Sequence, residues 1–205
     1  MTAASYERHA WGCAPQDAAQ ANEHARLLAR RAAAGDPRAR REVVLQVQAR
    51  VRAIANALLP SPADADDAAQ VALLEILRSI GGYRGDGPLV GWAARLAVRH
   101  VRRCVHRRRR QHEREHELDD HAPGPSSEPP LSESLPRDLR SYLGELPEDQ
   151  REALVLRFAL GFSFDEIADA TGAPVSTIRG RIRAGSKALR QTIAREQRFG
   201  TGATP

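Results

Sequence analysis

Residues 146–190 read LPEDQREALVLRFALGFSFDEIADATGAPVSTIRGRIRAGSKALR, and this stretch decides the fold that we expect for the chain. Ser163 and Glu166 have the spacing of a capping box, which starts a short helix. Gly172 ends that helix, and Pro174 opens a second helix after a tight turn. A short helix, a turn that contains glycine and a second helix make up a helix-turn-helix. The sequence therefore predicts this motif in the C-terminal part of the chain.

The second helix of the motif combines short polar residues with positive charge. Its polar face holds Ser176, Thr177, Arg179, Arg183 and Lys187. Side chains of this kind near the N-terminal end of a recognition helix reach base edges in the major groove, and further positive charges neutralise phosphates. A surface helix with ordinary solvated charge has the same pattern and is the alternative interpretation. Within a helix-turn-helix, the pattern favours DNA binding.

The composition of the chain favours helices and a polyanionic partner. Of its 205 residues, 41% are hydrophobic but only 4% are aromatic, so the core has to be built from Leu, Val, Ile and Ala. Ala and Leu favour helix, and the long alternating runs of β-branched residues that a sheet needs do not occur. The net charge of +5 and the isoelectric point of about 10.0 make nucleic acid the first partner to consider. We therefore expect an all-α, DNA-binding protein.

Shifts in composition divide the chain into two helical blocks and a linker. A polar stretch rich in Pro, Ser and Asp separates the blocks, and it has too few apolar residues to be ordered by burial. We expect two small helical domains joined by this flexible linker, with a tail at each end. The expected boundaries are 1–24 for the N-terminal tail, 25–110 for the first domain, 111–134 for the linker, 135–196 for the second domain and 197–205 for the C-terminal tail.

The first domain is expected to hold three helices and one loop. Its first helix opens at Asp36 and Pro37, and its apolar stripe is Val44, Val47, Val51, Ile54 and Leu58. Aspartates in the first turn of the second helix match the positive end of the helix dipole. A loop over residues 83–88 then leads into the third helix, which ends in an arginine run at 107–110.

Cysteine use and hydropathy indicate a reducing compartment. Cys13 and Cys104 lie far apart in the sequence, so a disulfide framework is not expected. No apolar run is long enough to span a membrane, and the N-terminal residues do not read as a signal peptide. We expect a cytoplasmic protein without membrane insertion.

Two parts of the chain resemble a known family in the same order as in that family. Residues 146–190 resemble region 4 of bacterial sigma factors, most closely the extracytoplasmic-function (ECF) group of the sigma-70 family. The first block resembles region 2 of that group in three stretches: GDPRAR at 35–40, DADDAAQ at 64–70 and YRGDGPLVGWAARLA at 83–97. The two matches, separated by a linker, cover about three-quarters of the chain. The fold that the resemblance implies is a region 2-like helical bundle followed by a region 4-like helix-turn-helix.

The resemblance implies a sigma factor that binds core RNA polymerase and directs promoter-specific transcription initiation. The polymerase-binding residues it implies are Asp67, Gln70 and Leu74. The recognition helix would read the upstream promoter element through the polar face described above. The loop and third helix would capture bases of the downstream element, with Tyr83, Arg84, Trp92, Arg95 and Arg99 as the implied residues.

Two of these residues have a competing structural interpretation. Trp92 is expected in the core rather than stacked on a base, and for Tyr83 the two roles remain equally open. The family implies no cofactor, and it commonly includes an anti-sigma factor as a further partner.

Several positions depart from the usual family pattern. Val71 and Leu77 stand where an acidic residue and an aromatic residue are usual, and Arg99 and Arg103 stand where Asn and Asp are common. Inside the recognition helix, Gly180 and Gly185 each cost about 1 kcal/mol relative to Ala.

Two other functions remain as alternatives. The chain could be a sigma-like DNA-binding regulator that does not itself initiate transcription. The stretch HEREH, with His112, Glu113 and His116, also matches the H-E-x-x-H signature of zinc peptidases. Because it lies between an arginine run and a Pro/Ser-rich segment, without an apolar face, we expect solvated charge there, no metal site and no enzyme activity.

Overall fold

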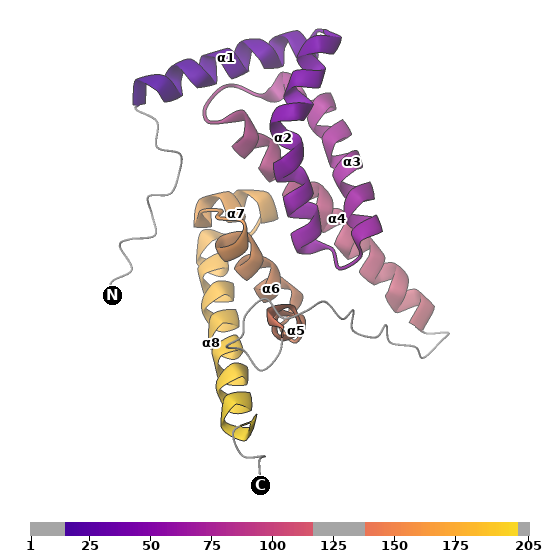
Figure 1. Cartoon of the computed structure of the whole chain (residues 1–205), viewed down its shortest axis with the longest axis vertical. Helices are drawn as coiled ribbons and strands as arrows, with labels where there is room; N and C mark the ends of the chain where they lie inside the picture. The colour runs from indigo at the N-terminus through magenta and orange to yellow at the C-terminus, as the bar shows by residue number, and fades with distance from the viewer. Residues whose placement is uncertain (1–14, 117–137, 201–205) are drawn as a thin grey trace.

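The computed structural model describes residues 15–116 and 138–200, and within these ranges the chain is helical and contains no strand (Figure 1). The expected all-α fold is thus confirmed. The first domain consists of α1 (Pro15–Ala33), α2 (Pro37–Leu58), α3 (Pro62–Ser79), a short 3-10 turn (Ile80–Gly82) and α4 (Leu89–His116). The second consists of α5 (Leu139–Gly144), α6 (Glu148–Leu154), a π-helical turn (Val155–Ala159), α7 (Phe164–Thr171) and α8 (Val175–Gly200).

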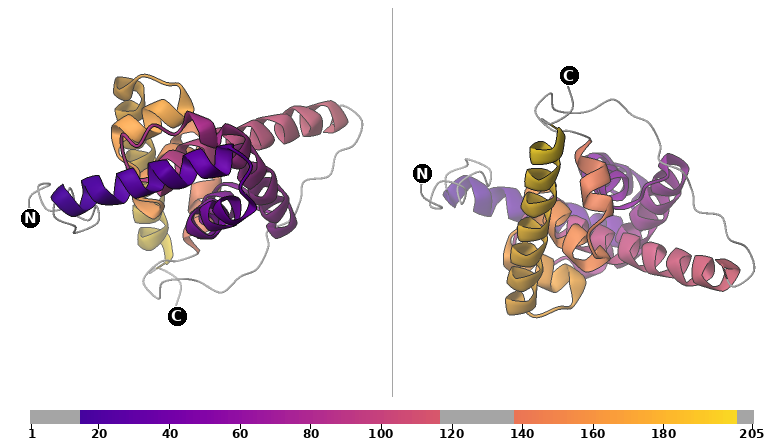
Figure 2. Two further views of the ribbon diagram at one scale, coloured as in Figure 1. Left: turned by 90° about the horizontal axis from the view of Figure 1, so that it is seen from above. Right: turned by 90° about the horizontal axis from the view of Figure 1, so that it is seen from below.

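Small aliphatic residues form the core of the first domain. Helices α2, α3 and α4 pack side by side, and α1 lies across one end of this bundle (Figures 1 and 2). The buried stripe of α2 is Val43, Val47, Val51 and Ile54, each with no exposed surface. The expected stripe was wrong at its start, because Val43 is buried whereas Val44 is half-buried.

Capping side chains fix where helices α2 and α3 begin. The Asp36 carboxylate accepts hydrogen bonds from the backbone N–H groups of Arg38 and Ala39, at 2.9 and 3.3 Å. The Ser61 hydroxyl accepts one from the N–H of Asp64 at 3.4 Å. A proline follows each capping residue in the first turn of its helix. Proline has no N–H, and the N–H groups of a first turn have no partner within the helix, so no helix hydrogen bond is lost.

The helices extend beyond the boundaries expected from the sequence. Helix α1 begins at Pro15, inside the segment assigned to the N-terminal tail, and its buried alanines and Leu28 pack on the bundle. Helix α4 continues to His116, past residue 110, because the stretch RRRRQHEREH holds good helix formers and neither Gly nor Pro. Helix α8 continues to Gly200. The rest of the expected linker and tails lies outside the described residues.

The helix-turn-helix has the capping that the sequence indicates. The Ser163 hydroxyl accepts from the Glu166 N–H at 3.2 Å, and the Glu166 carboxylate accepts from the Ser163 N–H at 2.9 Å. Phe162 before the cap and Ile167 after it are both buried. Gly172 ends α7 with φ +70°, a conformation that favours glycine.

Helix α8 crosses α6 so closely that a side chain at Gly185 would press on two side chains of α6. A Cβ atom at Gly185 would lie 2.9 Å from Leu154 Cδ1 and 3.2 Å from Gln150 Cβ. At Gly180, one and a half turns earlier, no atom of the described residues lies within 4 Å of such a Cβ atom. The helix-propensity cost of Gly185 is therefore offset by a close helix crossing, whereas Gly180 faces open space.

This difference predicts opposite effects of the same substitution at the two glycines. Gly180→Ala is expected to raise the free energy of unfolding by about 0.5–1 kcal/mol, since alanine favours helix and meets no neighbour. Gly185→Ala is expected to lower it by roughly 1–3 kcal/mol, because the methyl group overlaps the Leu154 and Gln150 side chains and the contact between α6 and α8 must shift to accommodate it. Urea unfolding of the two variants measures both values. Stabilisation by Gly185→Ala would contradict the crossing described here.

Candidate nucleic-acid interface

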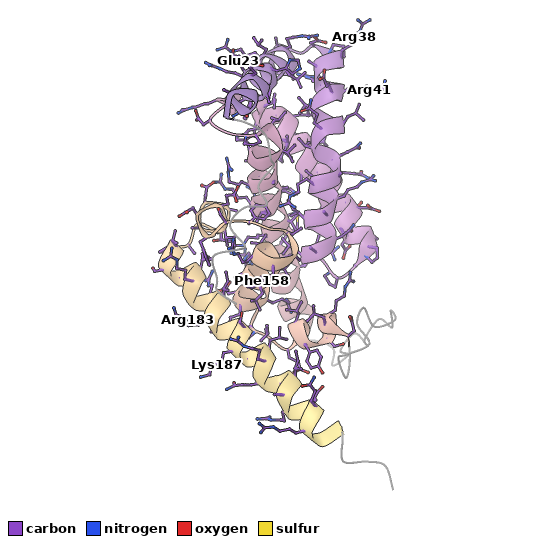
Figure 3. All side chains as sticks on the ribbon, turned by 60° about the vertical axis from the view of Figure 1, so that its left-hand side comes forward. Glu23, Arg38, Arg41, Phe158, Arg183 and Lys187 are labelled. Carbon is purple, nitrogen blue, oxygen red and sulfur yellow. The ribbon has the colours of Figure 1, made fainter. Side chains whose placement is uncertain are left out.

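The recognition helix presents its polar face to solvent. Ser176, Thr177, Arg179, Arg183 and Lys187 are all exposed on α8. Figure 3 shows Arg183 and Lys187 on the side of α8 that is turned away from the other helices. The structure thus brings together, on one accessible face, all five residues that the sequence assigns to the upstream element.

Neighbouring side chains of α8 have other roles. Arg181 is half-buried and donates to the Asp149 carboxylate at 2.6 Å, so it joins α8 to α6. The Arg179 guanidinium lies 5.3 Å from the centre of the Phe164 ring, which holds it at the N-terminal end of α7. Among the α8 arginines 179, 181 and 183, Arg179 and Arg183 are therefore the two that are accessible to a ligand.

The loop before α4 places Tyr83 inside and Arg84 outside. The Tyr83 side chain is buried, and its hydroxyl donates to the Gly87 carbonyl at 2.6 Å. Its ring meets the half-buried Trp92 ring edge-on, with 5.7 Å between centres. An open stacking face at Tyr83 is therefore not what the structure shows, because packing and the Gly87 hydrogen bond occupy the ring and hydroxyl. Trp92 lies against the core, as expected.

The two α4 arginines assigned to the downstream element contact the second domain. Arg99 donates to the Asp169 carboxylate at 2.7 Å and to the Asp169 carbonyl at 3.1 Å. Arg95 Nε lies 3.3 Å from the same carboxylate, and Arg95 is 3.9 Å from the Glu166 carboxylate. Both arginines thus meet oxygens of α7.

Two further arginines of the first domain follow the same pattern. Arg102 lies 2.6 Å from the Glu152 carboxylate and donates to the Thr171 carbonyl at 2.8 Å. Arg50 donates to the Leu160 carbonyl and lies 5.0 Å from the centre of the Phe162 ring. These arginine–oxygen contacts join the two domains.

Glu152 is the buried acid of this interface. Burial raises the pKa of its carboxyl, while the neighbouring Arg102 guanidinium acts in the opposite direction. The ion pair with Arg102 is therefore what keeps a charged carboxylate acceptable at this depth.

The outer face of α3 carries the residues assigned to polymerase binding. Asp67, Gln70 and Leu74 are exposed and one helical turn apart, and Leu74 keeps 52% of its surface accessible. Val71, which departs from the family pattern, adds a second exposed apolar side chain to this face. The face thus combines charge, amide and apolar groups.

The second domain has an apolar groove that the sequence did not predict. It has a volume of about 450 Å³, and its walls include Leu139, Leu143, Leu154, Phe158 and Leu189. Phe158 keeps 60% of its surface exposed, because the π-helical turn carries it to the rim. The apolar stretch around Phe158 was visible in the sequence, but the change of helical period that exposes it was not.

Among the described residues, no three His, Cys, Asp or Glu side chains are grouped so as to hold a metal ion. His100 Nε2 and Cys104 Sγ lie 3.5 Å apart, and the described part of the chain supplies no third ligand beside them. The side chains of His112, Glu113 and His116 lie outside the described part. No described helix has the length and apolar character that a bilayer crossing requires.

Comparisons with known proteins agree with this architecture. The family model for sigma-70 region 2 matches residues 43–113, and that for sigma-70 region 4 matches residues 137–189. The ECF RNA polymerase sigma factor EcfG of Rhodopseudomonas palustris is 35% identical over 149 residues, which are 72% of this chain and 81% of the relative. The chain belongs to the ECF group of the sigma-70 family. It is therefore an RNA polymerase sigma factor, and its function is promoter-directed transcription initiation.

Other relatives of this sigma factor carry corresponding names. The ECF RNA polymerase sigma-E factor of Escherichia coli K12 is 30% identical over 167 residues, 76% of this chain and 87% of the relative. The RNA polymerase sigma-H factor of Pseudomonas aeruginosa is 28% identical over 182 residues, 83% and 94% of the two chains. Sigma factors are generally not enzymes.

Two solved structures have the same fold. The sigma factor RpoE of Bartonella quintana, solved with the anti-sigma factor NepR, has a TM-score of 0.59 and 25% identity over 74% of this chain and 94% of its own. CnrH, solved with the cytosolic domain of CnrY, has a TM-score of 0.57 and 23% identity over 83% and 97% of the two chains.

Proposed function

We propose that this sigma factor binds core RNA polymerase through the outer face of α3 and promoter DNA through two separate basic surfaces. The polar face of α8 reads the upstream element, and Arg84, Arg95 and Arg99 hold the downstream element. The observation that carries the proposal is the accessible row on α8, where short polar residues precede Arg183 and Lys187. In this proposal the chain has two functional units, α1–α4 and α5–α8. Both act in the cytoplasm, and neither is catalytic.

Transcription in vitro tests whether binding through these surfaces leads to initiation. The assay combines purified core polymerase with the full chain. Its promoters are selected from a randomised library by the resulting holoenzyme. Transcripts that start at a defined position and require the chain support initiation. Binding of DNA or polymerase without such transcripts would contradict the proposal.

The α3 face predicts a specific loss of polymerase affinity. Leu74→Ser is expected to weaken binding to core polymerase about tenfold, because burying a leucine is worth about 1.5 kcal/mol or more. Leu45→Ser on α2 is the matched control, since Leu45 is 58% exposed and Leu74 is 52% exposed. Titration of labelled chain with core polymerase measures both. Equal loss in the two variants would remove the α3 face from the interface.

The α8 face predicts a change in salt dependence. If Arg183 neutralises a phosphate, Arg183→Ala should lower the slope of log affinity against log salt by about one. Arg52→Ala removes the same charge from an exposed position on α2 in the other domain. Holoenzyme binding to the upstream element at several salt concentrations gives both slopes. If Arg183→Ala leaves the slope unchanged but relaxes sequence preference, Arg183 reads a base instead.

To bind the downstream element, Arg95 and Arg99 must exchange their contacts with Asp169 for contacts with DNA. In the packed arrangement both arginines are held by Asp169, so DNA phosphates replace that carboxylate. Because partly exposed ion pairs are each worth about 0.2–1 kcal/mol, the exchange lowers affinity only modestly.

Asp169→Asn is therefore expected to raise the affinity of the chain for single-stranded downstream DNA by about two- to fivefold. Asp165→Asn removes an equal charge from an exposed position on the same helix and is the control. Fluorescence anisotropy with a labelled oligonucleotide measures both. Equal gains would show that net charge, rather than release of the two arginines, is responsible.

The apolar groove supports a second docking surface for core polymerase. Exposed apolar grooves on a soluble domain mark protein-binding sites, and polymerase is the protein partner of this family. An anti-sigma factor is a further partner for this chain, supported by the complexes in which RpoE and CnrH were solved.

A further inference from the structure

The loop between the 3-10 turn and α4 is held from inside by Tyr83. The Tyr83 hydroxyl donates to the Gly87 carbonyl at 2.6 Å, which closes residues 83–87 into a ring. The side chain is only 6% exposed, and its ring packs edge-on against Trp92. Burial raises the pKa of the hydroxyl, and Asp86 adds to this, so the group stays protonated and keeps donating.

Both ends of the loop are fixed as well. The Tyr83 N–H donates to the Ile80 carbonyl at 3.1 Å, and the Trp92 N–H donates to the Pro88 carbonyl at 3.1 Å. Between these ends, the side-chain hydrogen bond from Tyr83 to Gly87 is the only hydrogen bond across the loop among the described residues.

Helix α1 supports the same loop from outside. Gly85 has φ +84°, and a Cβ atom there would lie 3.5 Å from Arg26 Cβ and 3.6 Å from the Asn22 carbonyl oxygen. The tip of the loop thus rests on α1, and Figure 1 shows this loop passing beside that helix. Helix α1 precedes residue 43, where the region 2 match begins.

These supports decide which side chains face outward. Tyr83 points into the core, while Arg84 and Asp86 are exposed. A loop that already has its bound shape loses less conformational freedom when it takes up a ligand. The arrangement suits a loop that receives an extruded base without first having to fold.

We propose that Tyr83 is a positioning residue for promoter opening: its hydroxyl and helix α1 hold the loop in the shape that presents Arg84 to an extruded downstream base. The inference rests on the proposed function of this loop and adds the device that shapes it. Tyr83 itself does not touch DNA in this mechanism. Without the hydroxyl, the Gly87 carbonyl loses its partner, and the loop must be ordered by the base that it binds.

The test uses holoenzyme that carries Tyr83→Phe, which keeps the ring and removes only the hydroxyl. The matched control is Tyr142→Phe, where a buried hydroxyl donates to Glu196 at 2.6 Å in the other domain. Open-complex formation is followed with a fluorescent base in the downstream element of a library-selected promoter. The promoter is used in its selected form and with the captured base replaced.

Tyr83→Phe is expected to lower open-complex formation about fivefold and to reduce discrimination against the replaced base by a similar factor, the equivalent of one hydrogen bond. Tyr142→Phe should leave both quantities unchanged. A merely structural role for Tyr83 would lower the melting temperature but leave base discrimination intact, and that result would overturn the proposal.

Two further variants keep the proposal separate from the function on which it rests. Arg84→Ala tests whether the loop reads the base at all. If Arg84→Ala loses discrimination while Tyr83→Phe keeps it, the positioning role is overturned and the loop function stands. If neither loses discrimination, both are overturned. Gly85→Ala distorts the loop from the α1 side, because its φ is positive, and should reproduce the Tyr83→Phe defect.

Discussion

Close packing of small side chains is the constraint on which the first domain depends. With few aromatic residues available, α2, α3 and α4 meet through alanines and valines such as Ala69, Ala93, Ala97 and Val98. Helices that approach through such residues have little freedom to rotate, since any larger group on the contact face would separate them. The outward faces are set by the same packing. The α3 row of Asp67, Gln70 and Leu74 is therefore exposed as a consequence of which residues the core requires.

Arginine chemistry connects the core architecture with DNA binding. A guanidinium group seeks oxygen atoms, and carboxylates, backbone carbonyls and phosphates all supply them. In the packed arrangement, Arg95, Arg99 and Arg102 find oxygens of α6 and α7. The side chains suited to a polyanion are thus the ones that join the two domains. In the proposed function, DNA binding by Arg95 and Arg99 competes with domain packing for the same guanidinium groups.

The two surfaces that we propose to bind DNA differ in how they are held rigid. The α8 face is built on a helix that crosses α6 at Gly185, so its side chains start from a fixed backbone. The downstream surface includes a loop, which needs other means of being held. Tyr83 and α1 supply these, and the exposed Arg84 is the result. Loops carry function when the surrounding scaffold fixes them, and here a single side-chain hydrogen bond spans the loop.

The sequence by itself determined the local structure and the family. The capping box at Ser163, the turn at Gly172 and the polar face of α8 follow from rules that act over a few residues, and two motifs in order were enough to recognise a sigma factor. Helix ends were less predictable, because α1 and α4 extend as far as good helix formers and packing allow.

Only the tertiary structure decided which residues are free to act. Tyr83 and Arg84 are neighbours in sequence, yet one is buried and the other exposed, because burial depends on Trp92 and α1. Asp169 lies 70 residues from Arg99, so no local pattern relates them. The groove beside Phe158 depends on one π-helical turn. Side-chain partners across such distances arise from the packing of whole helices, and hydrophobic periodicity does not specify them.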